Sequence, residues 1–283
     1  MQRTIGAALA ADNSDERFYI AQGLTRTGKS TTLETIMAMM GDYGCTIQPE
    51  TLQDAKRSSQ GASGDIARMK GARFIVCPEP RKNMRLDVAL VKQLTGGDMV
   101  TARNLFKGEF SFRPRFQLWV NTNYLPEVND PTLFESQRVV VVPFNNRREE
   151  GQRDTRLKER MREPSFLSGV LNWAVNGNLM RFVSLGAVPS VCLAATEKYR
   201  SDSDRFAEFI AEHCETGTGL REDGARLYES YVEWTESEGC GTLKKQLFFG
   251  ELERRDGIRK AGRGTVRGKD SRNMFTGIRL RMP

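Results

Sequence analysis

The sequence predicts an α/β fold with a parallel sheet, and three observations lead to this class. Short apolar runs such as Phe74 to Cys77 have the length and composition of buried strands. Segments with apolar residues at helical spacing lie between these runs, as in Lys29 to Met40. A glycine-bounded loop, Gly23 to Ser30, joins the first expected strand to that helix. Because strands that alternate with helices form parallel sheets, we expect one here.

The elements of the first half follow from local patterns. Apolar runs predict strands over 17–22, 74–77, 116–120 and 139–142. Helical spacing predicts helices over 29–40, 65–69 and 86–94, and Gly41 stops the first of them. Alternating residues between glycines predict a β-hairpin over 97–116. Residues 49–64 are polar and small without a clear period, so we expect a mobile connection.

The second half has a different character. Residues 154–182 and 194–214 are expected to be helical, and the glycine-rich stretch 217–224 is the expected domain boundary. Two further helices, around 227–232 and 247–252, precede a basic ribbon that alternates over 273–282. This order predicts a winged-helix-like module. The expected domains are a core over 1–150, a helical segment over 151–216 and a basic module over 217–283.

Composition narrows the class of protein. The chain has 283 residues, 39% hydrophobic and 28% charged, which is an ordinary globular mix. No stretch approaches the ~18 apolar residues of a membrane span, and the expected location is the cytoplasm of a bacterial host cell. The net charge is +7, and arginine and lysine crowd the last part of the chain. This balance is compatible with nucleic acid as a partner. No cysteine stands in a CxxC pair, so we expect reduced thiols.

Residues 23–30 match the phosphate-binding motif GxxxxGK[ST] in full. The match lies after an expected strand and opens an expected helix, which is the context that the motif requires. Glycines let the backbone wrap phosphates, and the helix N-terminus favours their negative charge. Lys29 would contact the β- and γ-phosphates, and Ser30 would offer its hydroxyl to Mg²⁺. The expected nucleotide-binding residues are Gly23, Thr25, Arg26, Thr27, Gly28, Lys29, Ser30 and Thr31.

Two strand ends supply further candidates. Glu79 follows the strand 74–77, where it would orient the attacking water or hold Mg²⁺ through water. Asn123 follows the strand 116–120, where its amide would sense the γ-phosphate. The alternatives are a strand-end carboxylate without a role and a turn asparagine before Tyr124.

Together these motifs resemble the superfamily 3 helicases, specifically the C-terminal motor of phage and plasmid primase–helicases. The resemblance covers roughly residues 2 to 215. Its residues are Gln2 to Gly6, Lys29 to Ile36, Lys92 to Asp98, Thr101 to Lys107, Thr122-Asn123 with Pro126, Arg138 before Val139, Pro143-Phe144, and Tyr199 to Asp204 with Phe209-Ile210.

The resemblance implies an AAA+-like core that forms a homo-hexameric ring, hydrolyses ATP between subunits and moves 3′ to 5′ on single-stranded DNA. Arg138 would be the arginine finger, although the family often has two arginines in tandem and this chain has Gln137-Arg138. Its alternative is a salt-bridged residue at a strand start. In the hairpin, Lys107 would contact DNA in the ring channel, with Arg103 and Phe106 as companions; the alternatives are a solvated lysine and a core aromatic residue.

The expected function is therefore ATP-dependent DNA unwinding in a phage, prophage or plasmid replication system, with ATP and Mg²⁺ as cofactors. The expected partners are single-stranded and forked DNA, further copies of the chain, and a primase or polymerase region in cis or in trans. Two alternatives stay open: an origin-binding initiator with an ATP switch, and another AAA+ DNA motor.

Overall fold

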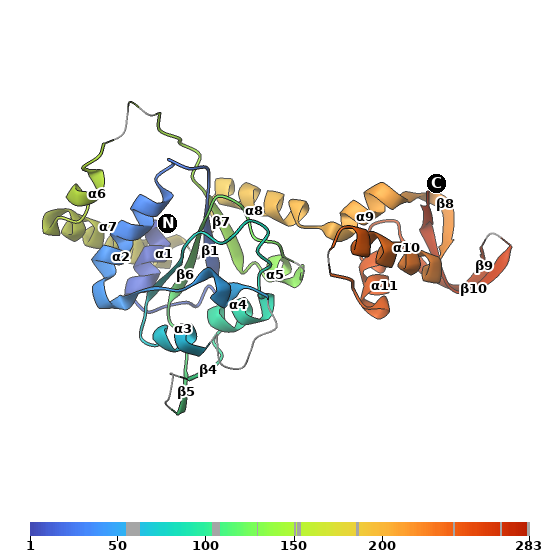
Figure 1. Cartoon of the computed structure of the whole chain (residues 1–283), viewed down its shortest axis with the longest axis horizontal. Helices are drawn as coiled ribbons and strands as arrows, with labels where there is room; N and C mark the ends of the chain where they lie inside the picture. Colours follow the sequence, from blue (N-terminus) through green and yellow to red (C-terminus); the bar gives the residue numbers. More distant parts are fainter. Residues whose placement is uncertain are drawn as a thin grey trace. The chain divides into compact units, whose positions relative to one another are not determined.

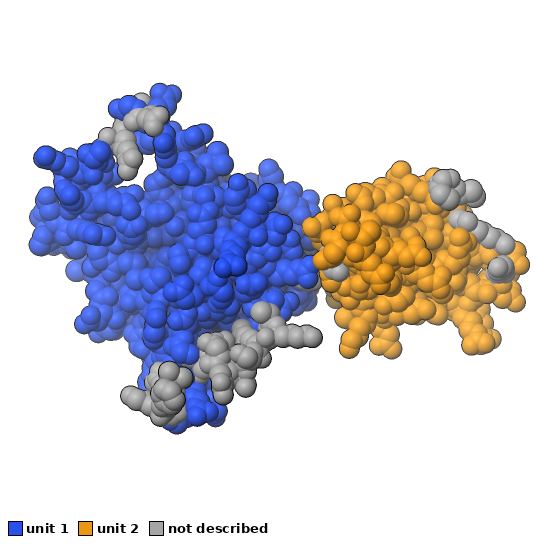
Figure 2. All heavy atoms as spheres, in the orientation of Figure 1, with its two compact units in different colours: residues 1–203 blue, residues 204–283 orange. Residues whose placement is uncertain are grey.

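The computed structural model of the chain describes residues 1–54, 63–103, 108–128, 130–149, 151, 154–184, 187–239, 241–266 and 268–281. The chain divides into two compact units, Met1–Ser203 (unit 1) and Asp204–Pro283 (unit 2), which are coloured separately in Figure 2. None of the helices in the described ranges has both the length and the apolar character needed to cross a membrane.

Unit 1 is a three-layer α/β structure (Figure 1). Its strands are β1 (Phe18–Gln22), β2 (Gly44–Thr46), β3 (Phe74–Cys77), β4 (Val100–Arg103), β5 (Glu109–Phe112), β6 (Gln117–Thr122) and β7 (Val139–Pro143). Its helices are α1 (Gln2–Leu9), α2 (Lys29–Met40), α3 (Ser63–Arg68), α4 (Val88–Thr95), α5 (Thr132–Glu135), α6 (Leu157–Arg160), α7 (Pro164–Ser184) and α8 (Ser190–Asp202), and 3-10 turns cover Gly41–Tyr43 and Pro49–Leu52.

Five strands form a parallel sheet in the order β2-β3-β6-β1-β7. The predicted fold class, an α/β P-loop core with a parallel sheet, is confirmed. Strand β6 lies between β1, which leads into the glycine loop, and β3, which precedes Glu79. The carboxyl ends of these three strands therefore meet at one edge of the sheet.

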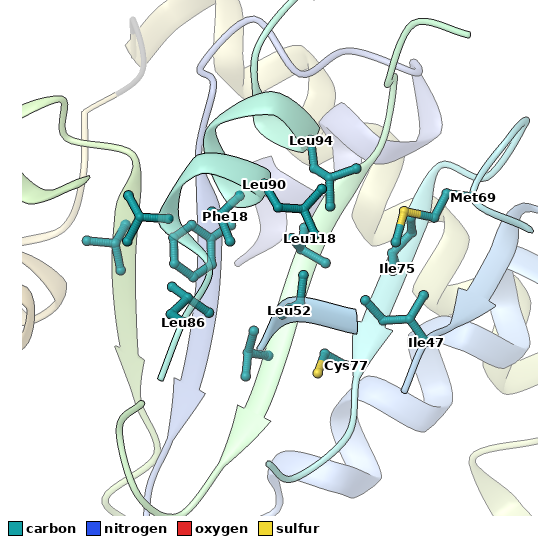
Figure 3. Packing of buried hydrophobic residues seen from close by; sticks show 14 of the residues in the cluster. Phe18, Ile47, Leu52, Met69, Ile75, Cys77, Leu86, Leu90, Leu94 and Leu118 are labelled. Atoms are coloured by element: carbon teal, nitrogen blue, oxygen red, sulfur yellow. The ribbon is translucent and has the colours of Figure 1, made fainter. Parts of the chain in front are cut away.

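Successive residues of the strands alternate between two apolar layers because side chains of a strand point to opposite faces. On one face, Phe18, Ile75 and Leu118 pack against Leu90 and Leu94 of α4, as Figure 3 shows. On the other face, residues such as Tyr19 and Trp119 pack against α1, α2 and α7. Packing on both faces fixes the position of the strand ends that carry the glycine loop.

Unit 2 has its own core and the connectivity of a winged helix. Its elements are α9 (Arg205–His213), β8 (Cys214–Asp223), α10 (Gly224–Ser237), α11 (Lys245–Glu253), β9 (Arg259–Val266) and β10 (Lys269–Leu280). The strands form an antiparallel sheet in the order β8-β10-β9. Its core is aromatic: Phe209, Phe248 and Phe275 are fully buried.

Three segments have a local structure that differs from the expected one. Residues 194–214 form two helices, α8 and α9, because the carboxylate of Asp204 caps α9 by accepting a hydrogen bond from the backbone N–H of Ala207 at 2.9 Å. The glycine-rich stretch 217–224 belongs largely to β8, whose pairing with β10 orders it. In the segment expected to be mobile, Pro49–Leu52 is an ordered turn that buries Leu52, and residues 55–62 lie outside the described residues. The three-domain division stays a prediction; the compact units divide between Ser203 and Asp204.

Candidate nucleotide-binding site

The loop between β1 and α2 has a backbone that requires glycine at two points. A Cβ at Gly23 would lie 2.3 Å from the carbonyl oxygen of Phe144, so only glycine fits there. Gly28, which caps α2, has φ 90°, a left-handed conformation that glycine adopts without strain. Arg26 also has a positive φ, 71°. These turns direct the loop around the N-terminus of α2, where unpaired N–H groups attract phosphate.

The predicted loop residues lie together at this turn. The hydroxyl of Thr27 donates to the carbonyl oxygen of Leu24 at 2.8 Å and closes the loop on itself. Thr25 and Arg26 form the turn, and Thr31 is in the first turn of α2, where its carbonyl accepts a hydrogen bond from Thr35.

Lys29 is held at the centre of the loop. Its ammonium donates to the carbonyl oxygens of Gly23 and Leu24 at 2.6 and 2.9 Å and to Oδ1 of Asn123 at 2.8 Å. The residue is 6% exposed. Burial lowers the pKa of Lys29, and the carboxylate of Glu79 acts in the opposite direction. A buried cation beside a helix N-terminus is a binding group for an anion.

Strand β6 and the turn after it bring two asparagines to the loop. Asn123 contacts Lys29, and Asn121 donates from Nδ2 to the hydroxyl oxygen of Ser30 at 3.0 Å. Oδ1 of Asn121 is buried and has no hydrogen-bond partner among the described residues. The sequence pointed to Asn123 and missed Asn121. Its position in the strand could have identified it. Asn121 is two residues after Trp119, so both side chains lie on the same face of the sheet, the face that packs against α2.

Glu79 is exposed at the end of β3 and lies within electrostatic reach of Lys29. No group of three or more histidine, cysteine or acidic residues suited to a metal ion occurs in the described ranges. The residues present fit a nucleotide-bound Mg²⁺ instead, since the exposed Ser30 hydroxyl would be a direct ligand and Glu79, near Lys29, could act through water. Phosphate oxygens and water would complete such a coordination sphere.

The chain beyond β7 runs along the glycine loop. The backbone N–H of Phe144 donates to Gln22, and that of Arg148 donates to the carbonyl oxygen of Arg26 at 3.1 Å. Lys158 of α6 forms an ion pair with Glu34 of α2 at 2.8 Å. Between α2 and α7 lies an apolar pocket of about 470 Å³, lined chiefly by Thr32, Thr35, Ile36, Phe166, Val170 and Trp173.

Arg138 is engaged within its own chain. Its guanidinium forms an ion pair with Glu16 at 2.5 Å and donates to the Thr95 hydroxyl at 3.2 Å and to the Lys92 carbonyl at 3.4 Å. It precedes Val139, which pairs with Phe18 at the start of β1. The strand length separates it from the glycine loop of the same chain by about 15 Å. The residue has the contacts of a salt-bridged strand-start arginine, and the trans-acting finger stays a prediction.

The expected hairpin is present as β4 and β5, which pair in antiparallel register from Val100–Phe112 to Arg103–Glu109. Arg103 is exposed at the end of β4. Phe106 and Lys107 lie outside the described residues. A role of Arg103, Phe106 and Lys107 in DNA contact therefore stays a prediction.

Comparison with known proteins gives viral relatives. A protein family described as "Family of unknown function (DUF5906)" matches residues 21–138. The chain is 26% identical over 262 residues to "Putative helicase L207/L206" of Acanthamoeba polyphaga mimivirus, covering 84% of this chain and 26% of that protein. It is 26% identical over 264 residues to "Putative helicase 022R" of Frog virus 3 (isolate Goorha), covering 86% and 27%. The chain thus spans about a quarter of the length of these relatives.

Among solved structures, the apo C-terminal region of NrS-1 is similar, with a TM-score of 0.44 and 15% identity, covering 87% of this chain and 55% of that one. The link between this chain and helicases is therefore its sequence similarity to the viral proteins that carry this name. The subdivision into superfamily 3, the primase connection and the bacterial host stay predictions.

Proposed function

We propose that this chain is the ATP-driven motor of a DNA helicase in a viral or mobile-element replication system. The observation that carries the proposal is the arrangement at the carboxyl edge of β1, β3 and β6. There, Lys29 and Ser30 are each hydrogen-bonded to an asparagine of the neighbouring strand, beside Glu79. The relatives named putative helicases support unwinding as the use of this site.

The roles of the residues follow from their positions. The loop N–H groups and the N-terminus of α2 would bind the phosphates of ATP. Lys29, now bonded to loop carbonyls, would exchange these partners for phosphate oxygens, which removes the penalty of its burial. Ser30 would hold Mg²⁺, which supplies charge neutralisation on the phosphates when bound.

Water attack on the γ-phosphate needs a group that orients the water and accepts its proton. We assign this task to Glu79, because it follows the strand next to β6 and lies near Lys29. Asn121 would hold the Ser30 hydroxyl toward the metal, and Asn123 would report the γ-phosphate through Lys29.

We further propose a homo-hexameric ring of the superfamily 3 type, in which a neighbour completes the site and single-stranded DNA passes the β4–β5 hairpin. A primase or polymerase region would act with it in cis or in trans. The test is unwinding of a forked duplex by the purified chain with and without ATP, together with Lys107→Ala, which should retain ATPase activity and lose unwinding.

Two alternatives are an origin-binding initiator in which ATP acts as a switch, and another AAA+ DNA motor. The winged-helix connectivity of unit 2 favours the first of them as a second candidate. Specific footprinting without unwinding would identify an initiator, and ATPase stimulation by duplex rather than single-stranded DNA would identify another motor.

A further inference from the structure

Unit 2 contains two helices, α10 and α11, in the order and setting of a helix-turn-helix. Tyr231 of α10 and Phe248 of α11 pack ring to ring with centroids 4.9 Å apart, and both are buried. In such pairs the second helix enters the major groove of DNA and its N-terminal residues contact base edges. Such a role requires a surface around α11 that suits DNA.

The cations around the start of α11 have no carboxylate partners. Lys244, Lys245 and Lys260 are exposed, and none of them forms an ion pair with a described residue. Two arginines of the unit, in contrast, are paired: Arg255 with Asp204 at 2.6 Å, and Arg279 with Glu215 at 2.6 Å.

A single ring brings two of these cations together. The ammonium of Lys245 lies 5.9 Å from the centroid of Phe249, and the ammonium of Lys260, on β9, lies 5.7 Å from the same centroid. The start of α11 and the first part of the β9–β10 ribbon therefore form one surface, which we call the basic face: Lys244, Lys245, Lys260. Like charges gathered without a counter-charge favour an anionic partner.

The carboxylates of α11 lie in its last turn, where Glu251 is paired with Arg254 at 2.7 Å, and those of α10 form a separate stripe. Glu229, Glu233 and Glu236 are exposed at helical spacing along α10. They occupy the side of α10 opposite Tyr231, whose side packs on α11. The acidic stripe therefore points away from α11 and does not neutralise the basic face.

The exposed side of α11 carries groups that suit base edges. Gln246 is exposed and has the amide that pairs with adenine in the major groove. Leu247 is 60% exposed and suits contact with a thymine methyl group. One turn later Gly250 has open space around it, which permits a close approach of the helix.

We propose that unit 2 binds double-stranded DNA, with α11 in the major groove and the basic face on the phosphates. This binding is separate from the strand-translocating activity proposed above. Lys244, Lys245 and Lys260 supply phosphate contacts, which carry affinity and no sequence information. Gln246 and Leu247 supply the base contacts, which carry sequence preference.

The test uses the full chain and a short labelled duplex of random sequence, with affinity measured by fluorescence anisotropy over a series of salt concentrations. We expect Lys244→Glu and Lys260→Glu each to weaken duplex binding by about tenfold or more and to lower the salt slope by about one. The matched control is Arg221→Glu on β8, the opposite edge strand of the same sheet, which should bind duplex as the unchanged chain does.

Two further measurements make the proposal specific. Gln246→Ala and Leu247→Ala should change the sequences selected from a randomised duplex pool while leaving the salt slope unchanged. Lys29→Ala, which should remove the ATPase activity, should retain duplex binding. A failure of the proposed motor function can therefore be distinguished from a failure of duplex binding by unit 2. Unchanged duplex affinity in the Lys244→Glu and Lys260→Glu proteins, or an equal loss in Arg221→Glu, would overturn the proposal.

Discussion

The ammonium of Lys29 donates a hydrogen bond to Oδ1 of Asn123 at 2.8 Å, although 94 residues separate the two along the chain. The contact exists because β1 and β6 are parallel neighbours and end together, so that the residues after each strand meet. A bound phosphate that draws the Lys29 ammonium toward itself would also break this contact. The pair thus links the phosphate-binding loop to the strand next to it.

Replacing Lys29 with alanine should abolish hydrolysis without unfolding the chain. The expected loss of ATPase activity is on the order of 10²-fold or more, because one preorganised charge at the phosphates disappears. Steady-state ATPase assays measure the activity, and circular dichroism measures the fold. Wild-type turnover in a folded Lys29→Ala protein would contradict the assignment.

The stability of the chain without nucleotide should depend on Lys29 at alkaline pH. Burial lowers the pKa of Lys29, so the unfolded chain binds more protons than the folded chain between the lowered value and the usual lysine value near 10.4. The free energy of unfolding should therefore gain a stabilising contribution as pH rises through this window. Comparing denaturant unfolding of the wild type and Lys29→Ala across the window isolates the effect, which should be absent in the variant.

Glu79→Gln should trap bound ATP. The substitution keeps the shape of the side chain and removes its charge and basicity, so the expected loss of turnover is about 10²–10⁴-fold, with nucleotide affinity retained. Equilibrium binding and single-turnover hydrolysis measure the two quantities. Asp42→Asn is a suitable control, since Asp42 is exposed beyond the opposite end of α2. Undiminished turnover of Glu79→Gln would show that another residue positions the water.

The two asparagines at the end of β6, Asn121 within it and Asn123 just after it, should have separable effects. Asn121 contacts Ser30, so Asn121→Ala should raise the Mg²⁺ concentration needed for half-maximal ATPase activity. Asn123 contacts Lys29, so Asn123→Ala should lower kcat without changing the Mg²⁺ requirement. Titrations of ATPase activity with Mg²⁺ in both variants measure these effects, and identical titration curves would show that the two asparagines do not have separate roles.

The sequence predicted the parallel sheet and the glycine loop well because both depend on local signals. Residues 29–40 form a helix with the bounds that apolar spacing and Gly41 indicated. Asn121 and the identity of Glu16 as the ion-pair partner of Arg138 were missed because they depend on which strands become neighbours and on side-chain direction. The break between α8 and α9 was missed because a helical pattern continues through it, while the Asp204 cap is one short signal.

The apolar pocket between α2 and α7 should receive the nucleobase. Ile36 lies about 10 Å along the helix from Lys29, within the span of a nucleotide whose phosphates are at the loop. Phe166→Ala should weaken ATP binding roughly tenfold through lost stacking and leave inorganic triphosphate binding unchanged. Calorimetry measures both ligands. Tryptophan fluorescence gives an independent readout, since Trp173 is 38% exposed in this pocket and Trp119 is fully buried. An equal loss of affinity for ATP and for triphosphate would show that the substitution acts on the glycine loop and not on binding of the nucleobase.

Arg138 should contribute to ATP hydrolysis only in an assembly of subunits. Arg138→Ala should fold, because the Thr95 hydroxyl keeps its hydrogen bond to the Val91 carbonyl at 2.8 Å and the Glu16 side chain is 48% exposed to water. If Arg138 acts on the neighbouring subunit, its removal should lower ATPase activity by about 10³–10⁵-fold. Glu16→Gln, which releases Arg138 from its ion pair, should retain or raise the activity. ATPase activity per subunit of the wild type should also rise steeply with protein concentration, because a head-to-tail contact completes the site.

Mixing subunits distinguishes action in trans from a structural role. Arg138→Ala and Lys29→Ala subunits are each expected to be inactive alone. In a mixed ring, some interfaces join an intact glycine loop to an intact Arg138, so part of the ATPase activity should return. Native mass spectrometry confirms that mixed rings form. If such rings form and no activity returns, Arg138 serves only to anchor the start of β7 through Glu16 and Thr95, since the strand length keeps it from the glycine loop of its own chain.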